Sequence, residues 1–148
     1  MLTISDTRTP STDTSGDAIV DALAAAGHEV VGRQIVRDEP LLVRDFVLRH
    51  APEAHVIITT GGTGITSRDT TYEAISGVLE KSLNGFGELF RMLSYDEIGP
   101  AAMLTRACAG TIGKTVVFAL PGSHNAVTLA MNKLILPEIG HIVREVSR

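Results

Sequence analysis

The sequence predicts a single α/β domain, doubly wound, with a mostly parallel β-sheet covered by helices on both faces. Apolar runs alternate with amphipathic stretches along the chain, which is the pattern of repeated β-α units. The length of 148 residues fits one domain over residues 1–148, and a hydrophobic fraction of 44% supplies enough apolar side chains for one continuous core.

Apolar runs define the strands that we expect. They are Leu2–Ser5, Glu29–Val36, His55–Thr60 and Thr115–Leu120. Between the first two, a helix is expected to begin at Thr14, with Asp17 in its first turn, and to end at Gly27, because glycine suits the residue after a helix.

Two further helices are predicted by their capping residues. One begins at Asp38-Glu39-Pro40, since proline suits the first helical turn, and ends at His50-Ala51-Pro52. The next begins around Thr70, because Thr70 and Glu73 have capping-box spacing.

In the second half of the chain, the sequence predicts helices before and after the strand Thr115–Leu120. The segment from Gly85 to about Ala109 is expected to form a helical hairpin, interrupted at Gly99-Pro100. After the last strand, a closing helix is expected from about Asn125 to Leu136, and Pro137 bends or restarts it.

Charge and composition restrict the partners. A net charge of −4 and few aromatic residues (4%) argue against nucleic acid, whose binders carry a basic surface. No apolar run approaches the roughly 20 residues that span a bilayer, and the first residues lack a signal-peptide pattern. We therefore expect a cytoplasmic protein with a small-molecule ligand and no membrane partner.

The strongest candidate site is the turn Thr60-Gly61-Gly62-Thr63-Gly64, called the glycine turn below. It follows an apolar strand, so it is expected at the carboxyl edge of the sheet, where backbone N–H groups can approach phosphate oxygens. Thr60 and Thr63 add hydroxyl donors. The structural alternative is a tight turn without a ligand. The turn contains no G-x-G-x-x-G, and no P-loop lysine follows it.

Asp38 and Asp69 are candidate ligands for Mg²⁺. Each follows a predicted strand and precedes a helix, so both are expected at the same sheet edge, where two carboxylates could share the ion with nucleotide phosphates. Two interpretations stay open for Asp69: it points back to the glycine turn, or it caps the third helix. Taken singly, each aspartate is more often a helix cap.

The segment Pro121-Gly122-Ser123, called the Pro-Gly-Ser loop below, supplies a second helix N-terminus and hydroxyl at the same edge. Phosphate on two adjacent loops would imply two phosphorylated groups meeting there. This pattern favours transfer chemistry.

Other reactive residues lack a catalytic pattern. Cys108 lies among small and apolar residues, as a buried structural thiol does, and a catalytic thiol is the less favoured interpretation. The five histidines show no metal spacing, and no Ser-His-Asp order is present.

These motifs together resemble the molybdopterin adenylyltransferase family, MogA/MoaB, over nearly the whole chain. The resemblance rests on the glycine turn with Arg68-Asp69, on Gly85-Phe86-Gly87-Glu88 with Arg91, and on the Pro-Gly-Ser loop. Thr3-Ile4-Ser5-Asp6, Ser15-Gly16-Asp17 and Arg37-Asp38-Glu39 stand in the same order, and Ser94–Gly99 is closer to the MoaB branch.

The resemblance implies a step of molybdenum cofactor synthesis in which molybdopterin is adenylylated by ATP with Mg²⁺ and pyrophosphate is released. It assigns Asp69 as the essential acidic residue and Asp38 as a second one, and the glycine turn with Gly122 and Ser123 as contacts to phosphates and pterin. It also implies trimers or hexamers and a possible molybdenum-insertase partner.

Two alternatives to this enzyme remain. One is a non-catalytic molybdopterin-binding or assembly module of the same fold, and the other is a nucleotide pyrophosphatase domain like those related to competence proteins. Independently, five apolar residues of the expected hairpin exceed what one sheet face needs and favour an oligomer, with core packing as the alternative; they are Phe86, Phe90, Met92, Leu93 and Met103.

Overall fold

A six-stranded sheet forms the centre of the computed structural model, which describes residues 1–148. In spatial order the strands are β2 (Gln34–Val36), β1 (Leu2–Ile4), β3 (Val56–Thr60), β6 (Thr115–Leu120), β5 (Cys108–Ile112) and β4 (Lys81–Ser82). The strands β2, β1, β3 and β6 pair in parallel, while β5 runs antiparallel to both of its neighbours. The predicted mostly parallel sheet is confirmed.

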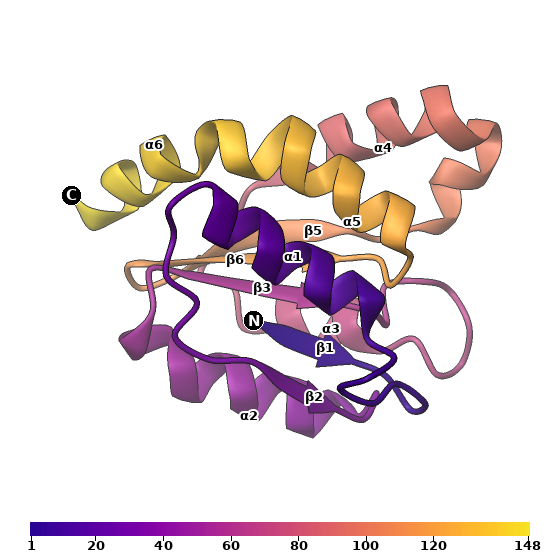
Figure 1. Cartoon of the computed structure of the whole chain (residues 1–148), viewed down its shortest axis with the longest axis horizontal. Coiled ribbons are helices and arrows are strands. Elements are labelled where there is room, and N and C mark those ends of the chain that lie inside the picture. The colour runs from indigo at the N-terminus through magenta and orange to yellow at the C-terminus, as the bar shows by residue number, and fades with distance from the viewer.

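Helices cover both faces of the sheet (Figure 1). One face carries α1 (Thr14–Ala25), α4 (Asn84–Ile98), α5 (His124–Ala130) and α6 (Leu136–Ser147) over a core cluster of 16 residues. The other carries α2 (Pro40–His50) and α3 (Thr71–Ser76) over a cluster of 10 residues. Short 3₁₀ turns follow α2 (Ala51–Glu53) and α4 (Gly99–Leu104). The doubly wound α/β fold predicted from the sequence is therefore the observed one.

The central strands β3 and β6 explain why the sheet assembles in this order. All six residues of β6 are buried, as are four of the five in β3, because helices cover both of their faces. Their register pairs Val56 with Val116 and Thr60 with Leu120, so both strands end at the same level. The chain segments that follow them therefore leave the sheet side by side.

The predicted helical hairpin from Gly85 to about Ala109 is wrong in its second half. The helix α4 ends at Ile98, where Gly99 adopts a positive φ of 68°, and the chain reaches β5 at Cys108 after a 3₁₀ turn. A two-residue turn at Gly113-Lys114, with φ +56° at the glycine, then joins β5 to β6. Residues 108–112 form a strand because they pair with β6, and the periodicity of the sequence does not reveal such pairing.

The predicted strand Glu29–Val36 is shortened to Gln34–Val36. The strand is short because the neighbouring strand β1 has only residues Leu2 to Ile4, which pair with Gln34 to Val36. The helix α1 is capped by Asp13, whose carboxylate accepts a hydrogen bond from the N–H of Gly16, one residue before the expected start.

The closing helix is longer than expected, because it does not stop at Leu136. It runs continuously over His124–Ser147, with a π-helical turn at Met131–Ile135 just before Pro137. Such a turn absorbs the backbone mismatch that proline creates inside a helix. By length and composition alone this helix could cross a membrane, with a mean hydropathy of 1.2 over its most apolar stretch, but its buried side chains pack in the 16-residue core.

Candidate functional site

The glycine turn and the Pro-Gly-Ser loop touch each other at the carboxyl edge of the sheet. The N–H of Gly61 donates to the carbonyl of Leu120 over 3.0 Å, and Thr60 Oγ1 donates to the carbonyl of Pro121 over 2.8 Å. A Cβ built on Gly122 would lie 3.4 Å from the Cα of Gly61, which is van der Waals contact. The two candidate phosphate loops thus form one continuous surface.

The first two glycines are required by backbone geometry. Gly61 and Gly62 have φ values of 104° and 71°, a region that other residues adopt only with strain. A Cβ on Gly61 would also stand 2.1 Å from the carbonyl oxygen of Ile4, at the end of β1. Part of the reason for glycine at these positions is therefore structural, because the tight turn packs against β1.

The surface formed by the two loops also carries unpaired backbone N–H groups. The N–H groups of Gly62, Thr63 and Gly64 donate no hydrogen bond within the chain, and neither do those of Gly122 and Ser123. The last two open the long helix that begins at His124, so the helix dipole adds positive potential. Such a cluster of donors is a ready binding site for an anion.

The hydroxyl groups at the site hold the loops. Thr60 Oγ1 donates to Pro121, and Thr63 Oγ1 lies 3.5 Å from Thr105 Oγ1. Ser123 Oγ accepts from the N–H of Ala126 and so caps the helix. The unpaired donors for a ligand are therefore the backbone N–H groups and the O–H of Ser123, which accepts in its cap bond and donates no hydrogen bond within the chain.

Asp38 is buried beside the glycine turn, with 7% of its surface exposed. Its Oδ1 accepts hydrogen bonds from Thr70 Oγ1 over 2.8 Å and from the Thr70 N–H over 3.4 Å. A Cβ on Gly62 would lie 2.7 Å from its Oδ2, so glycine is needed there to admit the carboxylate. Asp38 does not cap α2, whose cap position is Glu39.

Asp69 lies against the other end of the turn. Its Oδ2 accepts from the N–H and the Oγ1 of Thr66 over 2.8 and 2.7 Å, and a Cβ on Gly64 would lie 2.7 Å from the same oxygen. It does not cap α3, which begins at Thr71 and has Thr70 at its cap position without a side-chain cap bond. The expected capping box is absent as well, because Glu73 pairs with Arg106.

Asp38 and Asp69 are the residues of this site that could hold Mg²⁺ together with oxygens of a ligand. Asp38 Oδ2 and Asp69 Oδ1 accept no hydrogen bond within the chain, so each aspartate keeps one free oxygen. No group of three or more His, Cys, Asp or Glu side chains could hold a metal alone. Mg²⁺ needs no such group, since it is commonly bound by one or two carboxylates together with phosphate oxygens and water.

Arg106, just before β5, holds the loop that carries Asp69, and sequence reasoning missed it. Its Nη2 and Nε donate to the carbonyl of Gly64 over 2.7 and 2.9 Å, and Nη2 also donates to the carbonyl of Asp69 over 3.2 Å. Its own N–H donates to the carbonyl of Thr63. One guanidinium therefore ties together both ends of the segment from Gly64 to Asp69.

Two neighbours fix the guanidinium of Arg106. It pairs with Glu73, whose pKa is held below its usual value by the hydrogen bond from Arg106, and it lies 5.2 Å from the ring centre of Tyr72. The sequence predicts a helix for the segment before β5, so no sequence pattern places Arg106 at the site.

Arg68 anchors the same loop from the side of β1 and β2. Its Nε and Nη2 donate to the two carboxylate oxygens of Asp6, each over 3.0 Å, and Nη2 donates to the carbonyl of Asp38 over 3.2 Å. The hydrogen bond from Arg68 lowers the pKa of Asp6. Asp6 also accepts from the N–H of Asp38, so one ion pair positions both candidate aspartates.

Cys108 behaves as the structural thiol that the sequence predicts. It is half-buried at the start of β5, and burial raises the pKa of its thiol to about 11. A thiol with that pKa stays protonated near neutral pH and is a poor nucleophile.

Comparison with known proteins identifies the family of the chain. The family model described as "Probable molybdopterin binding domain" matches residues 1–141. The chain is 54% identical to molybdenum cofactor biosynthesis protein B of Bacillus cereus over 151 aligned residues, covering all of this chain and 89% of that protein. The chain belongs to the MogA/MoaB family of molybdenum cofactor biosynthesis proteins, on its MoaB branch.

Solved MoaB structures share the fold over its whole length. A crystal structure of molybdenum cofactor biosynthesis protein B has a TM-score of 0.95 at 55% identity, covering 99% of this chain and 93% of that one. The tungsten cofactor synthesizing protein MoaB from Pyrococcus furiosus has a TM-score of 0.87 at 40% identity, covering 99% and 94%. The resemblance inferred from the motifs of the sequence is confirmed.

Replacing Arg106 tests its role in this MoaB-type site. We expect Arg106→Gln to lower the free energy of unfolding by about 1–3 kcal/mol, because it removes charge-assisted hydrogen bonds to two carbonyls, and to speed amide exchange at Asp69. Urea denaturation and hydrogen exchange measure both effects. Arg49→Gln is the matched control, since Arg49 is exposed and pairs only with Asp45 along α2. Equal effects of the two substitutions would contradict the role of Arg106.

Proposed function

We propose that this protein adenylylates molybdopterin with Mg-ATP and releases pyrophosphate. The observation that carries this proposal is the pair of hydrogen bonds from Thr60 and Gly61 to Pro121 and Leu120, because it places two groups of unpaired N–H donors side by side. One continuous surface that carries both groups of donors suits a reaction that brings two phosphorylated molecules together. Family membership supports the pterin as one of them.

The proposed reaction needs no protein nucleophile. An oxygen of the terminal phosphate of molybdopterin forms a bond to the α-phosphorus of ATP, and the bond between this phosphorus and the bridging oxygen to the β-phosphate breaks. The electron pair of that bond leaves with pyrophosphate. The attacking oxygen is already anionic, so no side chain must remove a proton from it. Positioning and charge neutralisation are what the protein must supply.

The residues of the chain divide these tasks. The N–H groups of the glycine turn and the Pro-Gly-Ser loop bind phosphate oxygens and orient them. Asp38 and Asp69 would hold Mg²⁺ through their free oxygens, and the ion would neutralise the phosphates of ATP when bound. Arg68 and Arg106 keep the two carboxylates in place through the surrounding backbone.

A non-catalytic molybdopterin-binding module is the second candidate, and one observation favours it. One oxygen of each aspartate is already engaged, by Thr70 for Asp38 and by Thr66 for Asp69, so each carboxylate also has a structural task. Such a module would bind the pterin without turning over ATP. Calorimetry with and without Mg-ATP, alongside an assay for released pyrophosphate, distinguishes the two functions.

Substitution of the aspartates tests the catalytic proposal. We expect Asp69→Asn to lower turnover by about 100-fold or more and Asp38→Asn to lower it as well, since each removes negative charge where the metal and phosphates meet. Adenylylated pterin, separated by chromatography, is the readout. Asp21→Asn is the control, because Asp21 is exposed on α1 away from the site. Full turnover by Asp69→Asn would contradict the role proposed for this residue.

We also propose a homotrimer or hexamer that works in the cytoplasm and hands its product to a molybdenum-insertase partner. Phe86 and Phe90 are buried in the core, so they do not contribute to an interface. The exposed apolar side chains of α4 and the turn after it support the oligomer; they are Leu89, Met92, Tyr95, Ile98, Met103 and Leu104. We expect light scattering to give three or six times the chain mass, and a monomeric mass would contradict this proposal.

A further inference from the structure

The unpaired N–H groups of the two loops share a property of their peptide units. A trans peptide is planar, so its carbonyl and the N–H of the next residue point in opposite directions. The chain has no cis peptide bond. A donor that holds the carbonyl of such a unit therefore turns the N–H of the same unit away from itself.

Three peptide units of the glycine turn are held in this way. The carbonyl of Gly62 accepts from the first N–H of α3 over 3.0 Å, and the carbonyl of Thr63 accepts from the N–H of Arg106 over 2.9 Å. The carbonyl of Gly64 accepts from the guanidinium of Arg106. The N–H of Ile65, which belongs to this third unit, donates no hydrogen bond within the chain and extends the row of unpaired donors.

Two hydroxyl groups hold the peptide units of the Pro-Gly-Ser loop. Thr60 Oγ1 donates to the carbonyl of Pro121, whose peptide unit carries the N–H of Gly122. Ser15 Oγ donates to the carbonyl of Gly122 over 2.8 Å, and this unit carries the N–H of Ser123. Each unit thus combines a held carbonyl with an unpaired N–H, as in the glycine turn.

Ser15 reaches the loop from a distant part of the sequence. It lies in the first turn of α1, 107 residues before Gly122, and only 3% of its surface is exposed. A serine hydroxyl has one proton to donate, and Ser15 uses it on the Gly122 carbonyl, which accepts no other hydrogen bond within the chain. The orientation of the unit from Gly122 to Ser123 therefore depends on this hydroxyl.

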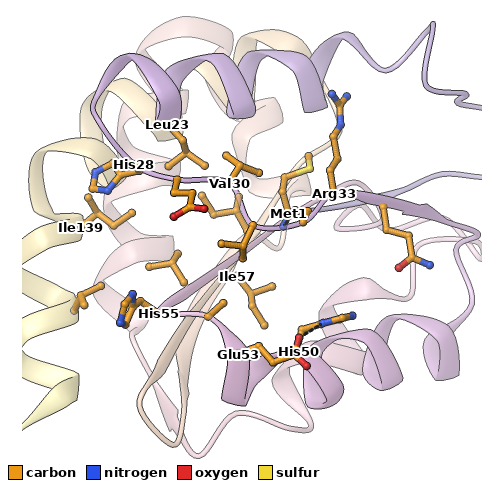
Figure 2. A pocket seen from close by; sticks show the side chains of 18 of the residues that line it. Met1, Leu23, His28, Val30, Arg33, His50, Glu53, His55, Ile57 and Ile139 are labelled. Carbon is orange, nitrogen blue, oxygen red and sulfur yellow. Dashed lines mark hydrogen bonds and ion pairs between the residues drawn. The ribbon is translucent and has the colours of Figure 1, made fainter.

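The start of α1 is itself fixed to the sheet. Asp13, the capping residue of α1, accepts from Thr3 Oγ1 of β1 over 2.6 Å. Arg33, just before β2, pairs with Asp13 over 3.0 Å and with Asp17 over 2.8 Å, and Figure 2 shows its side chain extending towards α1. The hydroxyl of Ser15 is therefore held in place relative to β1.

We propose that Ser15 is a positioning residue of the phosphate site, because its hydroxyl fixes the peptide unit that presents the N–H of Ser123 to a bound phosphate. The inference rests on the proposed function, since it concerns the same surface. Ser15 acts through the peptide, because its proton is used on Gly122. Donors that are oriented before the anion arrives need no reorganisation when it binds, so Ser15 strengthens binding without contacting the ligand.

The substitution Ser15→Ala removes the hydroxyl and little else. We expect the peptide unit between Gly122 and Ser123 to lose its fixed orientation in the ligand-free protein, because its carbonyl loses its donor. Residual dipolar couplings report the direction of each N–H bond. In Ser15→Ala, we expect the coupling of Ser123 to change, whereas that of Val127, inside α5, stays as in the unaltered protein.

Thr115→Val is the matched control at the opposite edge of the sheet. Thr115 is also 3% exposed, and its hydroxyl donates to the carbonyls of Ala51 and Ala54. Figure 2 shows this edge, with Glu53 and His55 beside a cavity. Both substitutions remove a buried hydroxyl that serves a carbonyl, so both lower the free energy of unfolding. Only Ser15→Ala should change the coupling of Ser123.

Titration with inorganic pyrophosphate measures the consequence for binding. We expect Ser15→Ala to raise the dissociation constant about fivefold, and Thr115→Val to change it by less than about twofold. An unchanged coupling at Ser123 in Ser15→Ala, or equal dissociation constants of the two variants, would overturn the proposal. Absence of pyrophosphate binding by the unaltered protein would overturn it together with the proposed function. Pyrophosphate binding without ATP turnover would contradict only the proposed adenylylation.

Discussion

The parallel pairing of β3 with β6 sets the positions of the two candidate phosphate loops. Both strands are covered by helices on two faces, and their register brings Thr60 level with Leu120. A slip by one residue would turn every buried side chain of one strand to the opposite face, so the core fixes this register. The glycine turn and the Pro-Gly-Ser loop meet because the two strands end together.

Two arginines then hold the surroundings of that contact. Arg106 lies just before β5, and Arg68 bonds to Asp6 just after β1, so the loop with Asp69 is attached to both halves of the sheet. Glycine at position 62 leaves room for Asp38, and glycine at position 64 leaves room for Asp69. The glycines therefore leave room for the carboxylates as well as forming the turn, and the unpaired N–H groups of the turn remain for a ligand.

The sequence predicted the features that depend on local chemistry. The apolar strands β3 and β6, the turns after them and the proline at the start of α2 follow from neighbouring residues, and together with the motif order they were enough for the family. The strand β5 was missed because Cys108–Ile112 becomes a strand through pairing with β6. The length of β2 likewise depends on the partner that β1 provides.

The details of the site were beyond sequence reasoning for the same reason. Asp38 bonds to Thr70, which is 32 residues away, and Arg106 reaches Gly64 across 42 residues. Helix capping was the natural local expectation for both aspartates. Instead, the two aspartates bond to Thr70 and Thr66, because loops from several strands converge at this site.

We propose that the two loops together form one anion-binding surface. A titration of the ¹⁵N-labelled protein with inorganic pyrophosphate, followed through its amide resonances, measures whether both loops bind the same anion. We expect the amides of Gly62, Gly64 and Ser123 to shift together with a single dissociation constant, while Val31, at the opposite edge of the sheet, stays unchanged. Shifts at one loop alone, or no shift at either loop, would contradict it.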